Sequence, residues 1–482
     1  MKKINNILTN IISTPVIPVA LAAITSLYSL EAKSFWVDET FSYYVSHYWN
    51  FLIYSIWNTE ANMSLYYVLL HFWILLGQSD YFIRLFSVIF AVLTVFVFYK
   101  LGKYMFNSKI AFISSLLLSL HTFFVLYAQE ARSYTLALFL ICLSVYSFLR
   151  YRENNKYKAL LIISSVLSGY AHIYALFVLS SLSAFTIVKK SIKTYFFSFA
   201  AILFFLIPLL LAPSLRSNQA SWIGNPTLSN IVGTFYLLSG DFLPLSVIYM
   251  LLFIYSGIVF MKDNKNLMLY MWIFVPILIS LVLSFLKPIY QSSYFVVVLP
   301  AFLLLVSNAV DQIKNRVWHN LILACLIVFS IIRLGFWYSN AVNSYSVGPI
   351  HVPFVLENQG EDWKDATKYI TEHGTKNDVV VFYVYFGKLD YEYYQTNNSP
   401  LPIEIASKSY NQGGGEFLPE PDVNLLNNLK NNYIWFVINR ETETKFCRST
   451  QYHNVLSALE KNYRLIEETD YSQVKVKKFI HL

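Results

Sequence analysis

Long apolar segments alternate with short polar stretches over the first two-thirds of the chain, from about residue 7 to residue 338. Many of these segments approach the roughly 20 residues that an α-helix needs to cross about 30 Å of hydrocarbon. The pattern therefore predicts about eleven spanning helices. Their expected positions are 7–30, 85–102, 110–128, 133–149, 157–171, 173–188, 195–212, 244–261, 267–286, 294–310 and 319–338.

One further apolar segment, residues 63–76, is short for a span. Counting it as a crossing would reverse every later loop and would place the basic loops outside the cell. We interpret it as an interfacial or re-entrant helix within a long first outer loop, residues 31–84.

The pattern changes after residue 339, where the chain becomes polar. Helical spacing recurs at 361–373 and 452–462, whereas 378–384, 433–439 and 474–480 have the composition or alternation of strands. We predict two domains, a transmembrane domain of residues 1–339 and a small mixed α/β domain of residues 340–482. Three consecutive glycines within 411–416 lack the strand-to-helix setting of a phosphate loop, so we expect a flexible loop there.

Composition agrees with a membrane protein, because 56% of the 482 residues are hydrophobic and 13% are charged. The mean hydropathy of +0.47 excludes an ordinary soluble domain. A net charge of +8 would suggest nucleic acid as the partner of a soluble chain. Here the basic residues lie in short loops between apolar spans, so we expect membrane lipids as surroundings and no nucleic-acid partner.

The basic residues also predict the orientation. One set of loops carries lysine and arginine repeatedly, from Lys100 to Arg316, whereas the opposite loops hold only Lys33, Arg84, Arg132, Arg216 and Lys287. The positive-inside bias then places the N-terminus in the cytoplasm of a plasma (inner) membrane protein. No cleavage site follows the first apolar segment, which we interpret as a retained helix. An odd number of spans leaves the C-terminal domain outside the cytoplasm.

Polar residues that are unusual in a membrane protein gather on the outer side of this topology. The adjacent pair Asp38-Glu39 follows the first span and can act as a general base or bind a divalent metal. The alternative is structural, with Asp38 as the N-cap of a helix that begins at Glu39. Several outer polar groups converge, which favours catalysis.

A second motif, residues 127–134, lies between the third and fourth spans and contains Gln129, Glu130, Arg132 and Tyr134. An arginine at headgroup depth can hold a lipid phosphate by paired hydrogen bonds. The structural alternative is an interfacial anchor in which Glu130 neutralises Arg132. The remaining outer candidates, each of which could also be a simple interfacial residue, are Arg84, His172, Tyr174, Lys287, Tyr290 and Tyr294.

These motifs resemble those of bacterial glycosyltransferases of the protein O-mannosyltransferase type, glycosyltransferase family 39, with aminoarabinose transferases as cousins. The resemblance rests on Asp38-Glu39, the segment Leu65-Tyr66-Tyr67 with the later Gly77, Arg84, the 127–134 motif, and in the tail 361–364 and Tyr393-Tyr394. It implies a GT-C architecture with an active site on the outer face and a sugar donor carried on dolichyl or undecaprenyl phosphate. Asp38 would match the aspartate that takes the acceptor's proton, and Arg84 the arginine on the donor phosphate, with Arg132 in a related role.

Three departures from the family pattern stand out. The loop 213–230 is short and holds no inserted domain, so the protein acceptor of the eukaryotic relatives is not carried over. Relatives often have Arg-Tyr before the tenth span, where this chain has Ser293-Tyr294, and Lys287 is the basic residue that could substitute. The turn Asn62-Met63-Ser64 stands where relatives commonly have prolines.

We therefore expect an inverting membrane glycosyltransferase that moves a sugar from a polyprenyl-phosphate donor to a lipid, glycan or protein acceptor. Asp38 is the expected general base and Glu39 its neighbour in catalysis. The expected phosphate ligands are Arg84, Arg132 and Lys287, and the expected substrate contacts are Gln129, Glu130, Tyr134, His172, Tyr174, Tyr290 and Tyr294.

No cofactor is required by the sequence, and a divalent metal on Asp38, Glu39 and His172 is left open. Two rivals differ in class: a lipid-linked sugar transporter or flippase, and another outer-face transferase such as an oligosaccharide ligase. A carrier should show ionisable groups near the bilayer midplane and broken helices in repeated halves.

Overall fold

The computed structural model describes residues 12–213, 223–260, 263–339, 360–382, 385–405, 422–439 and 450–482. The chain divides into two compact units. The first, here the bundle unit, comprises Met1–Leu30 and Ser46–Asn358, and the second, here the tail unit, comprises Glu31–Val45 and Gln359–Leu482. The segment that follows the first span therefore belongs with the C-terminal residues, although more than three hundred positions separate them in the sequence.

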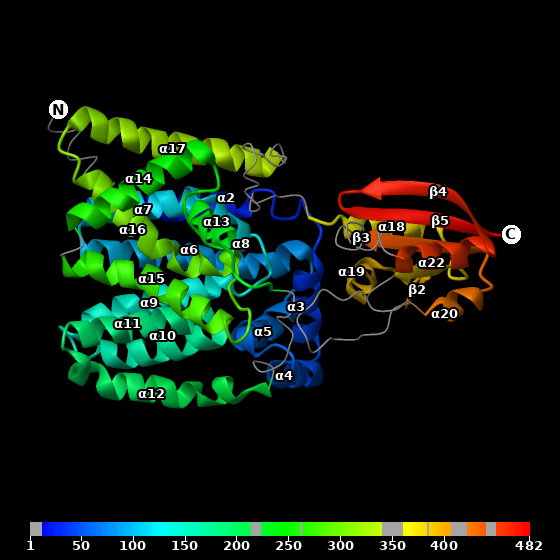
Figure 1. Cartoon of the computed structure of the whole chain (residues 1–482), viewed down its shortest axis with the longest axis horizontal. Coiled ribbons are helices and arrows are strands. Elements are labelled where there is room, and N and C mark those ends of the chain that lie inside the picture. Colours follow the sequence, from blue (N-terminus) through cyan, green and yellow to red (C-terminus); the bar gives the residue numbers. More distant parts are fainter. Residues whose placement is uncertain are drawn as a thin grey trace. The chain divides into compact units, whose positions relative to one another are not determined.

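The bundle unit is formed by helices that run alongside one another (Figure 1). In chain order they are α2 (Val16–Leu27), α4 (Trp49–Asn58), η1 (Ala61–Met63), α5 (Ser64–Ile74), α6 (Asp80–Met105), α7 (Ser108–Leu120), α8 (Thr122–Ala128), α9 (Tyr134–Tyr151), α10 (Tyr157–Ala171), α11 (Tyr174–Val188), α12 (Ile192–Leu211), α13 (Leu228–Leu238), α14 (Leu243–Phe260), α15 (Asn264–Ser284), η4 (Ser292–Val298), α16 (Leu299–Asp311) and α17 (Arg316–Ser339).

Length and composition make many of these helices candidates for crossing a membrane. Among the described residues, six helices are long and apolar enough, and up to eight if each of two bent pairs counts as one span. Each expected span contains a helix or a helix pair, but α2, α10 and α11 are shorter than a full crossing. The count of about eleven crossings stays a prediction. The short helix α5 has 11 residues, too few to cross a bilayer, as its sequence indicated.

Two of the candidate spans are broken. Helices α7 and α8 meet at 63°, and α13 and α14 meet at 92°. Helix α13 was not predicted, because its residues were assigned in part to the outer loop. The chain between α13 and α14 passes through Gly240 at φ +90° and Asp241 at φ +53°, and this left-handed backbone allows the sharp reversal.

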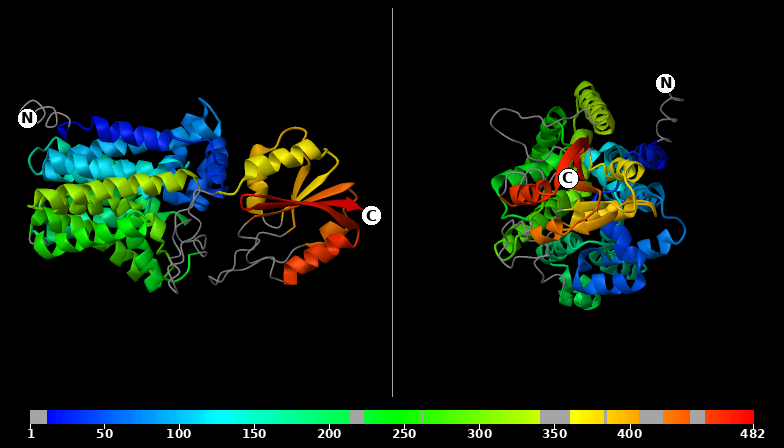
Figure 2. Two further views of the ribbon diagram at one scale, coloured as in Figure 1. Left: turned by 90° about the horizontal axis from the view of Figure 1, so that it is seen from above. Right: turned by 90° about the vertical axis from the view of Figure 1, so that its right-hand side faces the viewer.

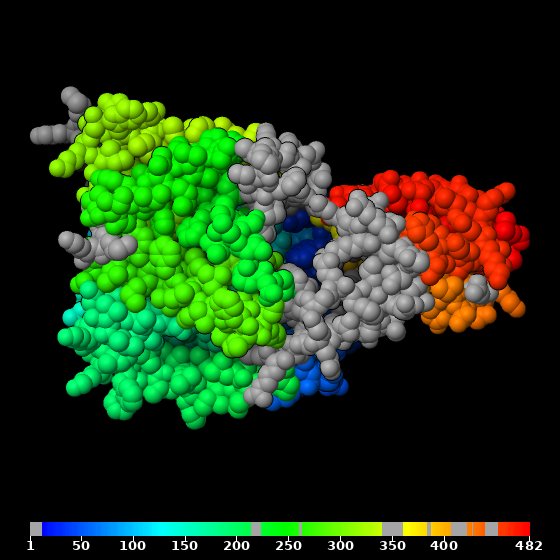
Figure 3. Space-filling model, in the orientation of Figure 1, coloured from blue at the N-terminus to red at the C-terminus, as the bar shows by residue number. Residues whose placement is uncertain are grey.

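The helices differ in how much of their surface other helices cover. In an 18-residue window of Ser292–Asp311, 89% is buried, whereas the share is 28% in the corresponding windows of α12 and α17. These two helices lie at opposite edges of the bundle in Figure 1. Most of their exposed residues are apolar, including Phe204, Leu203 and Ile331. In the space-filling view of Figure 3, atoms coloured teal to yellow-green, which belong to the bundle unit, form a broad surface on the left. Exposed apolar side chains on long helices are what lipid contact requires.

The tail unit contains the start of α3 (Val37–His47) and a five-stranded sheet in the order β2-β1-β3-β5-β4. Strands β2 (Leu401–Glu404), β1 (Val379–Phe382) and β3 (Tyr433–Asn439) are parallel, and β5 (Val474–His481) and β4 (Tyr463–Tyr471) continue the sheet antiparallel. The helices of this unit are α18 (Trp363–His373), α19 (Tyr385–Tyr394), α20 (Val423–Asn427) and α22 (Thr450–Glu460).

Both faces of this sheet are covered, as Figure 2 shows for α18 and α22 on opposite sides. Alternate residues of β1 and β3 point to opposite faces. Val381 and Phe436 pack with α22, whereas Val380 and Trp435 pack with α18 and α19. The unit is therefore a three-layer α/β domain.

The predicted tail elements agree with the structure at β1, β3, β5, α18 and α22. Helix α19 and strands β2 and β4 were not predicted. Strand β4 carries mostly exposed residues, four of its nine residues are charged, and an edge strand of this kind has no apolar alternation to detect. The expected loop at 411–416 lies outside the described residues.

Candidate functional site

The acidic pair lies in the first turn of α3, in the tail unit. The backbone N–H groups of Glu39 and Thr40 donate to the carbonyl of Trp36 at 2.8 and 3.1 Å. The helix thus begins at Val37, and the alternative in which Asp38 caps a helix starting at Glu39 is wrong. Both carboxylates instead lie where the helix dipole favours negative charge.

Contacts within the tail unit hold this turn. The Ser34 hydroxyl donates to Asp362 at 3.0 Å, and the backbone N–H of Phe35 donates to the Tyr394 hydroxyl at 2.7 Å. Within the helix, the hydroxyl of Thr40 donates to Asp390 at 2.5 Å. Glu39, Thr40 and Asp390 are all fully buried. The acidic pair is therefore built into the tail unit by Asp362 and Tyr394, which belong to segments of the family resemblance, and by Asp390, which the sequence did not single out.

The 127–134 motif forms a tight turn between α8 and α9 in the bundle unit. The N–H of Arg132 donates to the Glu130 carbonyl at 2.8 Å, and the Ser87 hydroxyl of α6 donates to the Arg132 carbonyl at 3.3 Å. Both Glu130 and Arg132 are buried. A turn held from α6 presents a buried guanidinium and a carboxylate at the ends of the helices.

His172 lies in the turn between α10 and α11 and is 1% exposed. Its Nδ1 accepts the N–H of Tyr174 at 3.2 Å, which leaves the ring proton on Nε2. Burial, and secondarily the charge of Arg132, lower the pKa of His172 to about 3. The imidazole is therefore neutral near pH 7, and within the described part of the chain its Nε2 has no hydrogen-bond partner.

Tyrosine rings surround this imidazole. The ring centroids of Tyr134, Tyr174 and Tyr294 lie 5.2, 5.8 and 5.3 Å from that of His172. We call His172, Arg132 and these three tyrosines the His172 cluster. The positive charge of Arg132 contributes to the lowered pKa of His172, so the guanidinium lies near enough to act on the imidazole. The cluster combines a cation, a neutral donor and flat aromatic faces.

Three tyrosine hydroxyls of this region serve the fold. Tyr174 donates to the Ile289 carbonyl at 2.5 Å, and Tyr127 donates to the Ser293 carbonyl at 3.2 Å. The Tyr290 hydroxyl pairs with Thr234 of α13 at 2.8 Å. These bonds fix the segment 289–293, and with it the start of η4, against α8, α11 and α13.

Gln129 and Arg84 also bond to backbone. The Gln129 amide donates to the carbonyls of Ser26 and Tyr28 at 3.3 and 2.7 Å, and Arg84 Nη1 donates to the Leu30 carbonyl at 3.0 Å. Both side chains hold the chain that leaves α2. Arg84 is fully buried.

The turn that replaces prolines of the relatives has a clear structural role. The Asn62 side-chain oxygen accepts the N–H of Ile173 at 2.7 Å, so the amide caps the turn that carries His172. Lys287, the expected substitute for a missing arginine, follows α15. Partial burial lowers the pKa of its ammonium group.

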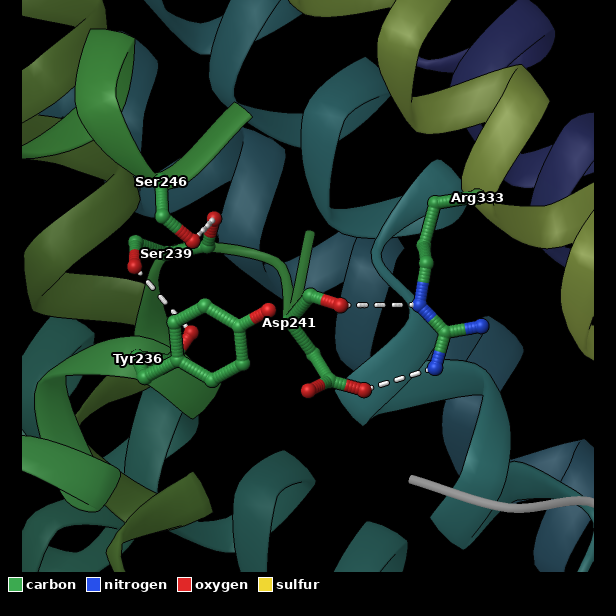
Figure 4. A network of polar contacts seen from close by, with 5 residues as sticks. All are labelled: Tyr236, Ser239, Asp241, Ser246 and Arg333. Carbon is green, nitrogen blue, oxygen red and sulfur yellow. Dashed lines mark hydrogen bonds and ion pairs between the residues drawn. The ribbon is translucent and has the colours of Figure 1, made fainter. Parts of the chain in front are cut away.

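An ion pair that was not predicted from the sequence lies inside the bundle unit. Arg333 of α17 donates to the Asp241 carboxylate at 2.6 Å and to the Asp241 carbonyl at 3.0 Å, and both side chains are buried. Figure 4 shows the guanidinium facing both oxygens at the turn between α13 and α14. Arg333 stands within an apolar segment, and this signal could have identified it.

No group of three or more histidine, cysteine, aspartate or glutamate residues suited to a metal ion occurs among the residues that the structure describes. The metal hypothesis on Asp38, Glu39 and His172 therefore gains no support from the geometry.

Comparisons with known proteins agree with the family resemblance. The family model described as dolichyl-phosphate-mannose-protein mannosyltransferase matches residues 63–215, which include Arg84, the 127–134 motif and His172. No curated protein matches the chain significantly. The family match covers about a third of the chain and omits the acidic pair.

Solved structures show the fold. ArnT from Cupriavidus metallidurans in the apo state matches with a TM-score of 0.63 at 13% identity, covering 96% of this chain and 97% of that chain. The same protein bound to undecaprenyl phosphate gives 0.60 at 13% identity, with the same coverage of both chains. An oligosaccharyltransferase from Archaeoglobus fulgidus, in complex with Zn and sulfate, gives 0.51 at 13% identity over 93% of this chain and 71% of that chain.

These matches confirm the expected fold class, a GT-C-type helical membrane protein with a small C-terminal sheet domain. Together with the family model they support a multi-pass membrane glycosyltransferase.

Proposed function

We propose that the protein transfers a sugar from a polyprenyl-phosphate donor to an acceptor hydroxyl at the outer face of the plasma membrane, with inversion at the anomeric carbon. The His172 cluster binds the donor phosphate and sugar, and Asp38 is the general base. The relative whose structure holds undecaprenyl phosphate supports the class of carrier.

The observation that carries this proposal is the buried, neutral His172 beside Arg132. A donor as deeply buried as Nε2 is normally hydrogen-bonded, so a ligand with an acceptor oxygen would complete it. Arg132 favours an anionic ligand, and the tyrosines offer faces for a sugar ring. A phosphate-linked sugar satisfies all three requirements.

In the reaction, the acceptor oxygen attacks the anomeric carbon as the carbon–oxygen bond to the phosphate breaks. The acceptor's proton passes to Asp38, and the polyprenyl phosphate leaves with the bonding electron pair. Charge grows on the leaving phosphate, where a fixed arginine stabilises the transition state more than the ground state. Glu39 supports Asp38, and Arg84 and Lys287 add positive charge to the donor side.

The expected substrate contacts fall into two groups, those that shape the site and those that contact the substrate. Tyr174 and Gln129 donate to backbone carbonyls, and the Tyr290 hydroxyl pairs with that of Thr234, so we assign these three residues to shaping the site. We assign Tyr134, Tyr294 and Glu130 to contact with the substrate because the two rings face His172 and Glu130 shares the turn of Arg132. The acceptor is a lipid, a glycan or a protein.

One observation favours a carrier as the second candidate. The bend of 92° between α13 and α14 and the buried Asp241–Arg333 pair beside it are features of transporters with broken helices. The family match and the fold weigh toward the transferase. A carrier would move the lipid-linked sugar without cleaving it, which an assay can distinguish.

The test is transfer of radiolabelled sugar from a panel of polyprenyl-phosphate sugars, by purified protein in membranes that contain candidate acceptors. Wild type should transfer label, and Asp38→Asn should lower the rate by about 10²- to 10⁴-fold, because a general base is lost. Asp365→Asn, which neutralises an exposed carboxylate of the same unit, is the matched control. Translocation of intact donor without cleavage would overturn the proposal in favour of the carrier.

A further inference from the structure

Helix α3 begins inside the tail unit, and three side chains of that unit contact its first turn or the residues just before it. The Ser34 hydroxyl donates to Asp362, and the backbone N–H of Phe35 donates to the Tyr394 hydroxyl. The Thr40 hydroxyl donates to Asp390. Thr40 and Asp390 are 350 positions apart in the sequence. Of the three, the Thr40–Asp390 bond is the one placed directly beside Glu39 in the helix.

Asp390 is an unusual partner for a hydroxyl. It is fully buried, its Oδ1 accepts the Thr40 hydroxyl, and its Oδ2 has no hydrogen-bond partner among the described residues. A buried carboxylate normally has several donors or a cation. On its own helix the nearest charges, Lys388 and Glu392, lie 3.8 Å apart and pair with each other.

The charged groups that act on Asp390 are other carboxylates. Burial raises the pKa of Asp390 well above its ordinary value, the Thr40 hydroxyl opposes this, and Glu361, Asp38 and Glu39 raise the pKa further. Glu361 precedes α18, whereas Asp38 and Glu39 belong to α3. Nearby negative charges and burial both disfavour the ionised form, so the geometry and charges favour a protonated Asp390.

We propose that Asp390 is a positioning residue for the acidic pair: through Thr40 it fixes the first turn of α3 and so sets where Asp38 and Glu39 present their carboxylates. Asp390 does this as a neutral acid, which adds no further negative charge beside the pair. The catalytic consequence rests on the proposed function, whereas the anchoring of α3 does not.

Substitutions at positions 390 and 40 separate the effect of the Thr40–Asp390 hydrogen bond from the effect of the charge of Asp390. Asn at position 390 keeps an oxygen for the Thr40 hydroxyl and resembles the neutral acid, whereas Ala removes the acceptor. Thr40→Ser keeps the hydroxyl and Thr40→Val removes it. Asp378→Ala is the matched control, because Asp378 is another buried aspartate of the same unit, which accepts the N–H of Thr375 at 2.9 Å and does not touch α3 in any bond shown.

The first readout is hydrogen–deuterium exchange of full-length protein in detergent, followed on peptides that cover residues 31–45. Asp390→Ala and Thr40→Val should raise exchange there at least several-fold, because the turn loses its anchor, whereas Asp390→Asn, Thr40→Ser and Asp378→Ala should leave it near the wild-type level. Equal exchange in all six proteins would overturn the anchoring.

The second readout is sugar transfer with the same set. Asp390→Ala and Thr40→Val should lower kcat by about 10-fold or more with little change in donor KM, and Asp390→Asn and Thr40→Ser should restore most of it. If Asp390→Asn is as impaired as Asp390→Ala, and added Mg²⁺ rescues neither variant, the neutral-acid role is overturned. Activity would then require the negative charge of Asp390.

The outcomes also separate the two proposals. Loss of protection in α3 together with no transfer by wild type would contradict the proposed function and leave the anchoring in place. Normal transfer by Thr40→Val and Asp390→Ala would contradict the positioning role and leave the proposed function in place. Infrared difference spectra, in which a protonated carboxyl band of wild type is lost in Asp390→Asn, test the neutral acid without reference to activity.

Discussion

The two units handle buried charge in opposite ways. In the bundle unit, Arg333 faces the carboxylate of Asp241 at 2.6 Å, and His172 stays neutral beside Arg132. In the tail unit, the groups that act on the buried Asp390 are the carboxylates Glu361, Asp38 and Glu39. In these examples the bundle unit sets an arginine beside a carboxylate or a neutral imidazole, whereas the tail unit gathers carboxylates around Asp390.

This difference has a physical consequence for function. A cation beside a neutral hydrogen-bond donor favours an anionic ligand, since both groups can face its oxygens without a proton moving. A group of carboxylates that shares a proton favours proton exchange instead. The bundle unit therefore suits the donor phosphate, and the tail unit suits the acceptor's proton.

The largest expected effect concerns the ion pair of the bundle. Asp241→Ala leaves Arg333 buried with its main ionic partner gone, and the free energy of unfolding should fall by about 3–5 kcal/mol. The loss can be followed as reaction of the buried Cys142 with a thiol dye on heating, in a background where Cys325 and Cys447 are replaced.

Double replacement Asp241→Leu with Arg333→Met supplies the control. Well-packed apolar residues in place of a buried ion pair are often neutral or stabilising by about 1–4 kcal/mol. Recovery of stability in the double variant would show that the pair is not needed for the fold. If the stable double variant also transfers sugar normally, the pair has no part in the reaction.

The second effect concerns the phosphate side. Arg132→Ala should raise the barrier to transfer by about 2.7–4 kcal/mol, a loss of about 10²- to 10³-fold in kcat, because one fixed contact to the growing charge is lost. Arg132→Lys should recover part of the activity as a point charge without the paired geometry. The measurement is single-turnover transfer with excess enzyme.

The matched control for Arg132 is Lys158→Ala, which removes a partly exposed basic residue of the bundle unit. An Arg132→Ala protein with a normal rate but lower thermal stability would contradict the phosphate role and would leave only the interfacial anchor. A loss of rate in Lys158→Ala of the same size would point to net charge instead.

A third, smaller effect concerns the neutral donor. His172→Phe keeps the aromatic packing and removes Nε2–H, so transition-state binding should weaken by about 1.5–3 kcal/mol, the range for a hydrogen bond to a charged group. His172→Gln keeps a donor and should retain more activity. The loss is measured as the ratio of kcat/KM in wild type to kcat/KM in His172→Phe with phosphate-linked donors. An unchanged kcat/KM in His172→Phe would exclude a direct contact.

Much of this arrangement could be predicted from the sequence where the signal is local. Apolar runs located the helices, a β-rich run located β3, and alternating residues located β5. Arg132 and His172 were identified because polar residues next to apolar spans are rare. Even the short α5 could be separated from a span by length.

The remainder depends on pairs that are distant in the sequence. Asp390 lies in an aromatic, acidic stretch that resembles a solvated helix, and only its contact with Thr40 distinguishes it. Helix α13 was missed because its apolar run is 11 residues long and is followed by a turn through Gly240. The start of α3 at Val37 depends on backbone bonds to Trp36, which residue types alone do not show.

The smallest expected effect is the pH dependence that His172 gives to stability. Its folded-state pKa of about 3 lies below the ordinary value of 6.5, so below pH 6.5 the unfolded chain binds a proton that the folded chain does not. Wild type should therefore lose stability as the pH falls from about 6.5 toward 3, and His172→Phe should lose less over this range. Thermal unfolding of both proteins in one detergent at pH 5, 6, 7 and 8, measured by tryptophan fluorescence, gives the comparison. The two curves should run parallel between pH 7 and 8, where the imidazole is neutral in both states, and separate on the acid side. Parallel curves throughout would mean that the imidazole titrates normally in the folded protein, and the tyrosine-lined cluster would then be open to water and unsuited to holding a neutral donor against a phosphate.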